Sequence, residues 1–202
     1  MEGTSAPIKE ISKLCIKYDS KLLIDEAHAL GVMGPEGRGE SFGLKEPISI
    51  ISGTFGKAFG SGGAFLATDK ITGENLIQNC GAFRYTTALA PPLCASALTA
   101  LHLIQSNPRW CSELREKSIA LRNKLSQVGW QRPAGEGPII SIILGSDELA
   151  IDCQKKLEAQ GLLAVAIRPP TVPEGKSRLR LVIRRNTPDQ AFERLIEVLK
   201  NK

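Results

Sequence analysis

Two hydrophobic patterns organise the first half of the chain. Residues 6–18 place apolar side chains three and four positions apart, which predicts an amphipathic helix. Short apolar runs at 22–24 and 48–51 are each followed by polar or glycine residues, as in buried parallel strands, and residues 62–68 predict a third strand. Together they indicate an α/β sheet, which places ligands beyond the carboxyl ends of its strands.

The second half of the chain alternates between helical and strand patterns. Residues 88–105 are small and apolar and predict a buried helix, which Pro108 ends. An amphipathic helix follows and ends at Gly129. The remaining pattern predicts a small α+β set, with strands at 138–144, 162–167 and 178–183 and helices at 147–161 and 189–200. We therefore expect two domains, residues 1–107 and 108–202.

Composition and charge exclude several classes of protein. The net charge of +5 is spread along the chain, and only residues 177–185 are locally basic, so we expect no nucleic-acid partner. The five cysteines form no CxxC pair, which argues against a zinc site and against a disulfide framework. No apolar run approaches 18 residues and no leader pattern is visible. These features predict a cytoplasmic protein without a metal or a membrane segment.

Two nucleotide-binding motifs that the sequence suggests are incomplete. The tetrapeptide "DEAH" at 25–28 also occurs in nucleic-acid helicases, which need a P-loop as well. Around the glycine-lysine pair Gly56 and Lys57, Ile51 replaces the first glycine of that motif and Ala58 replaces its hydroxyl. The run that begins at Gly60 does not complete a GxGxxG fingerprint either.

What remains is Asp25 at one strand end, His28 three residues later and Lys57 after the next strand. Pyridoxal phosphate (PLP) enzymes need such groups, because a lysine amine binds the cofactor aldehyde and a carboxylate keeps the pyridine nitrogen protonated. The small, apolar neighbours of Lys57 would disfavour its charged form and favour a reactive amine. Alone, an acid or a histidine at a strand end is more often a structural cap than a functional residue.

Four segments strengthen the PLP interpretation. They are "LLIDEAHALGVMGPEGRG", "SGTFGKAFGSGGAFLAT", "FRYTTALAPP" and "AIRPPTVPEGKSRLRL", in that order. They resemble the α-oxoamine synthase family of fold-type I PLP enzymes, and the likeness runs from near residue 1 to the C-terminus. The resemblance implies that residues 1–107 are part of the PLP-binding large domain and that 108–202 form the small C-terminal domain.

The resemblance also implies roles for individual residues near the cofactor. Lys57 would form the Schiff base with PLP and later remove the Cα proton of the substrate. Asp25 would pair with the pyridine nitrogen, and His28 would hydrogen-bond the phenolic oxygen. Thr54 would contact the cofactor phosphate.

Three further residues would act at a shared site. Thr86 and Thr87 resemble the threonines that reach the phosphate of the partner subunit, which implies a homodimer with its active site at the interface. Arg168 would bind the substrate carboxylate, a bidentate task suited to guanidinium.

The C-terminal block "AIRPPTVP" favours one reaction within the family. It implies decarboxylative condensation of L-alanine with pimeloyl-CoA or a pimeloyl-acyl carrier protein, giving 8-amino-7-oxononanoate for biotin synthesis. Another α-oxoamine synthase, a glycine or serine C-acyltransferase, is the alternative. Members of the family are roughly twice this length, so we expect a truncated chain that does not sustain catalysis alone. An inactive remnant or a subunit that completes a partner chain is the non-enzymatic alternative.

Overall fold

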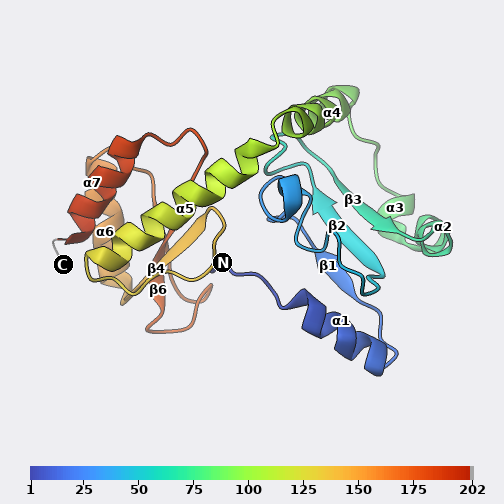
Figure 1. Cartoon of the computed structure of the whole chain (residues 1–202), viewed down its shortest axis with the longest axis horizontal. Coiled ribbons are helices and arrows are strands. Elements are labelled where there is room, and N and C mark those ends of the chain that lie inside the picture. The colour runs from blue at the N-terminus through green and yellow to red at the C-terminus, as the bar shows by residue number, and fades with distance from the viewer. Residues whose placement is uncertain (201–202) are drawn as a thin grey trace. The chain divides into compact units, whose positions relative to one another are not determined.

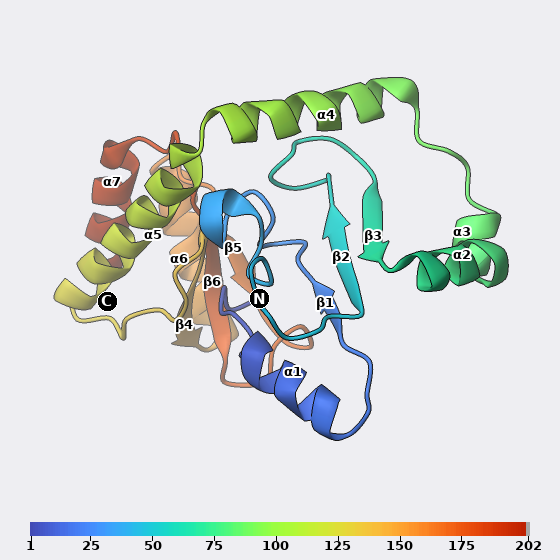
Figure 2. The same cartoon turned by 45° about the vertical axis from the view of Figure 1, so that its right-hand side comes forward.

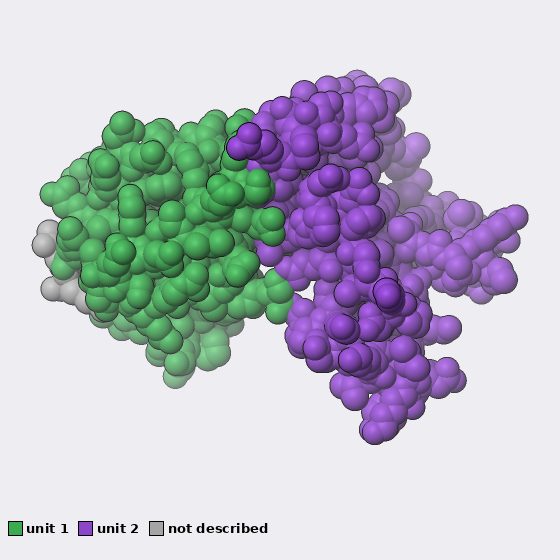
Figure 3. Space-filling model, in the orientation of Figure 1, with its two compact units in different colours: residues 1–5, 112–202 green, residues 6–111 purple. Residues whose placement is uncertain are grey.

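The computed structural model describes residues 1–200, which fold as two compact units (Figure 3). The N-terminal unit contains residues 6–111. The C-terminal unit contains the chain from residue 112 onward together with residues 1–5. No pattern in the sequence indicated that the first five residues join the C-terminal unit.

The N-terminal unit is built on a three-stranded sheet in the order β1-β2-β3 (Figure 1). Strand β1 (Leu23–Asp25) pairs in parallel with β2 (Ile50–Thr54). Strand β3 (Ala64–Thr68) returns antiparallel to β2. The three predicted strands are confirmed. The antiparallel return of β3 follows from the short loop between it and β2, since a parallel crossover needs a dozen residues or more.

Four helices flank this sheet. Helix α1 (Ile8–Lys17) and helix α4 (Pro91–Ser106) match the predicted helices. Helices α2 (Lys70–Asn79) and α3 (Gly81–Arg84) were not predicted. A local signal for α2 was present, because Asp69 caps its first turn by accepting hydrogen bonds from the backbone and hydroxyl of Thr72. The hydroxyl contact is the main cause that lowers the pKa of Asp69.

Two segments expected to be buried are exposed. Leu23 in β1 is 55% exposed, and β1 is one of the two edge strands of the sheet among the residues that the structure describes. In α4, Ala97 is buried, whereas Leu98 is 54% and Leu103 is 49% exposed. The apolar residues of α4 surround the helix, so one side packs on its own unit while the other side stays open.

The C-terminal unit is an antiparallel sheet covered by helices (Figure 1). Strands β4 (Ile139–Gly145), β6 (Ser177–Val182) and β5 (Val165–Ile167) lie in that order. Their packing partners include α5 (Arg109–Gln127), α6 (Asp147–Ala159) and α7 (Asp189–Lys200), and the core they share contains Leu121, Leu125, Ile140, Ile142, Leu157, Leu179, Leu181, Phe192, Leu195 and Leu199. The predicted α+β set is confirmed.

A buried arginine organises one end of this unit. Arg122 on α5 has no exposed surface, and its guanidinium donates hydrogen bonds to the carbonyl oxygens of Ser118, Ala134, Gly137 and Ile139. Burial lowers the pKa of Arg122 to about 10. These bonds fix the loop that leads from α5 into β4.

Candidate active site

Parallel pairing brings the predicted residues of the N-terminal unit to one edge of its sheet. Asp25, the last residue of β1, pairs with Ser52 of β2, and the amide of Glu26 donates to the carbonyl of Ser52 at 2.8 Å. Strand β2 continues two residues further, to Thr54. The turn after β1 and the loop after β2 therefore leave the sheet at the same edge, as the carboxyl ends of parallel strands do.

The turn after β1 carries an acid and an imidazole. Asp25 is exposed, and its Oδ1 accepts a hydrogen bond from the amide of Ala27 at 2.8 Å. His28 is also exposed and lies between residues whose backbone groups close the turn, because the amides of Ala29 and Leu30 both donate to the carbonyl of Glu26. Both functional groups are therefore accessible from solvent at the strand end.

The loop that carries Lys57 is closed by hydrogen bonds at its base. The amide of Phe55 donates to the carbonyl of Gly63 at 2.9 Å, and the amide of Ser61 donates to the carbonyl of Phe55 at 2.8 Å. The Ser61 hydroxyl donates to the carbonyl of Leu93 at 2.8 Å, which ties the loop to α4 (Figure 2). The loop is thus an ordered platform rather than an open chain.

Phenylalanine rings support this loop from within. The Phe55 ring meets the Phe59 ring edge to face with centroids 5.3 Å apart, and it lies 5.4 Å from the Phe65 ring. Aromatic packing of this kind fixes the ring positions. The loop adopts a left-handed backbone at Gly60, where φ is +60°, a conformation that favours glycine.

The Lys57 side chain is exposed. The apolar surroundings that the sequence predicted do not enclose its amine, because the neighbouring glycines carry no side chains to cover it and the phenylalanines pack on one another. This corrects the expectation of a desolvated lysine for this chain by itself.

Thr54 acts within the loop. Its Oγ1 donates to the carbonyl of Gly63 and accepts from the amide of Gly56, both at 3.1 Å. The hydroxyl proton that a phosphate oxygen would accept is therefore directed at Gly63.

The other predicted residues lie elsewhere. Thr86 and Thr87 are exposed in the irregular segment between α3 and α4 of the N-terminal unit. Arg168 belongs to the C-terminal unit, where it is exposed directly after β5, and its carbonyl accepts from the amide of Thr171 at 3.0 Å. The structure thus groups Asp25, His28, Thr54 and Lys57 around one sheet edge.

The sequence did not single out Glu26, the second acid of "DEAH". It is 2% exposed, and its carboxylate accepts hydrogen bonds from the amides of Glu40 and Ser41 at 3.1 and 2.7 Å. No sequence signal separates this buried acid from its exposed neighbour Asp25.

Comparison with family models decides the wider relationship. Residues 1–199 match the model described as aminotransferase class I and II. The chain belongs to this family. It is 38% identical over 201 residues to the 8-amino-7-oxononanoate synthase of Methylobacillus flagellatus, a match that covers 98% of this chain and 51% of that protein. The chain therefore spans about half the length of the curated relatives it matches.

Solved structures share the family fold. The 8-amino-7-oxononanoate synthase from Francisella tularensis is 27% identical, with a TM-score of 0.82 over 95% of this chain and 57% of that one. A serine palmitoyltransferase variant from S. paucimobilis, solved with a bound PLP-myriocin aldimine, is also 27% identical, with a TM-score of 0.90 over 99% and 51% of the two chains. The fold is that of fold-type I aminotransferase-like proteins, as the sequence predicted.

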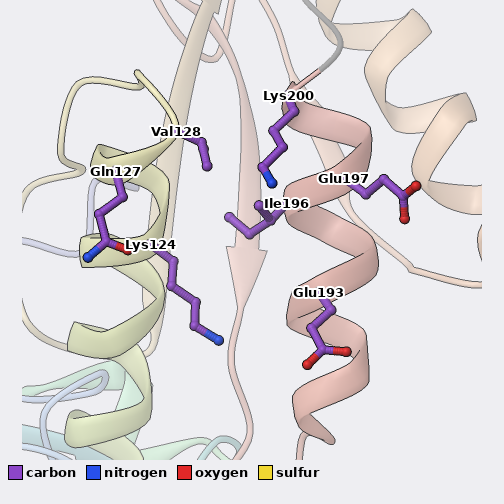
Figure 4. A pocket seen from close by; sticks show the side chains of 7 residues that line it. All are labelled: Lys124, Gln127, Val128, Glu193, Ile196, Glu197 and Lys200. Atoms are coloured by element: carbon purple, nitrogen blue, oxygen red, sulfur yellow. The ribbon is translucent and has the colours of Figure 1, made fainter.

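A groove on the C-terminal unit is lined by charged residues of both signs. The groove, of about 610 Å³, lies between α5, which carries Lys124, and α7, which carries Glu193, Glu197 and Lys200 (Figure 4); Gln127, Val128 and Ile196 complete its lining. Within residues 1–200, no three His, Cys, Asp or Glu side chains cluster as metal ligands. Over the same residues, every helix is too short or too polar to span a bilayer.

Proposed function

We propose that this chain carries the lysine-bearing part of a PLP-dependent α-oxoamine synthase of the 8-amino-7-oxononanoate synthase type. The reaction is the decarboxylative condensation of L-alanine with a pimeloyl thioester. The observation that carries the proposal is the parallel pairing of β1 and β2, which sets Asp25, His28 and the Lys57 loop on one edge. The named relatives support the choice of reaction.

The residues at this edge suit the cofactor chemically. Lys57 offers an exposed primary amine, Asp25 a carboxylate and His28 an imidazole. A Cβ at Gly60 would meet nothing within 4 Å, so the loop is open on the side that Gly60 faces. When bound, PLP supplies an electron sink for the carbanion formed at the substrate Cα.

The chain's own groups perform the remaining tasks. Lys57 would hold the cofactor through its amine and would move the Cα proton of alanine, since an amine at this position can act as nucleophile and as base. Asp25 would hold the cofactor ring at its pyridine nitrogen and favour the protonated form, and His28 would hold the ring at its phenolic oxygen. Arg168 takes the alanine carboxylate through its planar guanidinium.

A second copy of the protein completes the proposed site. Thr86 and Thr87 are exposed and so are available to the phosphate held by a partner subunit. The open apolar side of α4, with Leu98 and Leu103 exposed, follows them in the chain and supports burial at an interface. We propose a homodimer.

The half-length match affects what the chain does alone. The match covers 51% of the Methylobacillus flagellatus protein, and in our proposal the other half of such relatives supplies further strands and the main phosphate site at a helix N-terminus. The isolated chain is therefore expected to lack turnover.

A complementation assay tests the reaction. The chain is mixed with the N-terminal half of the Methylobacillus flagellatus enzyme, PLP, L-alanine and either pimeloyl-CoA or pimeloyl-acyl carrier protein, and 8-amino-7-oxononanoate is measured by mass spectrometry. Product is expected from the mixture and not from either half alone. Product from glycine or serine but not from alanine would support the alternative C-acyltransferase. Absence of any product while the relative's own two halves complement each other would refute the proposal.

A further inference from the structure

Glu26 is a buried acid with both carboxylate oxygens in use. Its side chain lies between the β1 strand end and the far end of the following loop, where Oε1 accepts from the amide of Ser41 and Oε2 from the amide of Glu40. The residue is 2% exposed. Hydrogen bonds to a buried carboxylate are strong, and each amide would be costly to leave unpaired.

The backbone of Glu26 connects these carboxylate hydrogen bonds to the candidate site. Its amide donates to Ser52 of β2, and its carbonyl accepts from Ala29 and Leu30. Asp25 precedes it directly, and His28 lies inside the turn that its carbonyl closes. Glu26 therefore joins three segments: strand β2, the turn with the acid and the imidazole, and residues 40–41.

The loop that leads from the turn after β1 to residues 40–41 has a shape that accommodates the Glu26 carboxylate. Gly39 has a φ of +94°, and a Cβ there would lie 2.9 Å from the carboxyl carbon of Glu26, so glycine is required for the approach. The loop is cross-linked at 2.7 Å from the Gly31 amide to the Gly37 carbonyl and at 3.0 Å from the Gly39 amide to the Met33 carbonyl. The Glu26 carboxylate therefore binds a loop whose shape is already held by its own backbone hydrogen bonds.

We propose that Glu26 is a positioning residue for the PLP site: its buried carboxylate fixes the turn that presents Asp25 and His28. This inference rests on the proposed function, although the effect of Glu26 on the structure of the turn can be measured without the cofactor. In this proposal Glu26 acts through its two neighbours, Asp25 and His28, and not directly on the cofactor or the substrate.

The test compares Glu26→Gln with Glu36→Gln. In the first variant an amide NH₂ faces one of the two buried amides, so one hydrogen bond is lost. Glu36 lies in the same loop but is exposed and paired with Arg38 at 2.9 Å, which makes it the matched control. The chain has two histidines, so the imidazole Cε1–H resonance of His102 on α4 serves as an internal reference for that of His28 in NMR spectra.

In Glu26→Gln, the His28 resonance is expected to shift or broaden while that of His102 stays in place. Apparent PLP affinity, from borohydride trapping at Lys57, should fall about tenfold. Glu36→Gln should change neither. If Glu26→Gln does not fold, Gly39→Ala displaces the carboxylate from the other side and should shift the same resonance.

An unchanged His28 resonance and PLP affinity in a folded Glu26→Gln chain, with only a lower melting temperature, would overturn the inference. Failure of wild type to bind PLP at Lys57 would instead count against the proposed function. In that case the two histidine resonances alone decide whether Glu26 positions the turn.

Discussion

The Oγ1 of Thr54 donates a hydrogen bond of 3.1 Å to the carbonyl oxygen of Gly63 across the base of the Lys57 loop. The same oxygen accepts from the amide of Gly56, one residue before the lysine. A single hydroxyl thus joins both ends of the loop and fixes the backbone from which the reactive amine projects.

Replacing this hydroxyl should loosen the loop. Thr54→Val keeps the shape of the side chain but removes both hydrogen bonds, each worth about 1 kcal/mol. We expect amide hydrogen exchange at Gly56 to accelerate by about fivefold or more without any cofactor present. Thr54→Ser is the control and should exchange as wild type does. Equal exchange in Thr54→Val and wild type would show that the hydroxyl does not hold the loop.

The sequence predicted the strands around the site well but not the role of Thr54 in the loop. The apolar runs at 22–24 and 48–51 located β1 and β2, although β2 extends to Thr54, through residues that the pattern assigned to a glycine turn. The hydrogen bond from Thr54 to Gly63 depends on the antiparallel return of β3, which places two residues nine positions apart side by side. The local pattern of apolar and polar residues does not predict that β2 and β3 pair.

Burial was the least predictable property. The apolar pattern of residues 88–105 predicted a buried helix, yet Leu98 and Leu103 of α4 are exposed. Conversely, Arg122 and Glu26 are charged residues that the structure buries. The composition of a segment shows how much apolar surface it could bury. Whether that surface is buried depends on distant parts of the chain or on another chain that covers it.

The open side of α4 should drive association. Leu98→Glu places a charge on this surface, whereas Leu163→Glu alters a residue that is 88% exposed in the loop before β5 and serves as the control. Sedimentation analysis should show wild type and the control above the 21.8 kDa monomer mass, with Leu98→Glu shifted toward it. A wild-type chain that stays monomeric at every concentration would argue against this surface as an interface.

The C-terminal unit should depend on its buried guanidinium. Arg122→Met removes hydrogen bonds to four carbonyl oxygens, and leaving these buried acceptors unpaired should lower the free energy of unfolding by about 3 kcal/mol. Arg132→Met is the matched control, because Arg132 is exposed and its Nε donates a hydrogen bond to the Asn123 side chain. It should cost less than about 0.5 kcal/mol. Urea denaturation measures both, and equal losses would refute the special role of Arg122.

The most direct test of the account is the attachment of PLP to Lys57. Wild type, Lys57→Ala and Lys45→Ala are incubated with PLP, reduced with borohydride, digested and mapped by mass spectrometry; Lys45 is an exposed lysine of the same unit. We predict that wild type and Lys45→Ala carry the cofactor mass preferentially at Lys57 and that Lys57→Ala loses this preference. Labelling spread evenly over the surface lysines of wild type would contradict the assignment of Lys57 as the cofactor lysine.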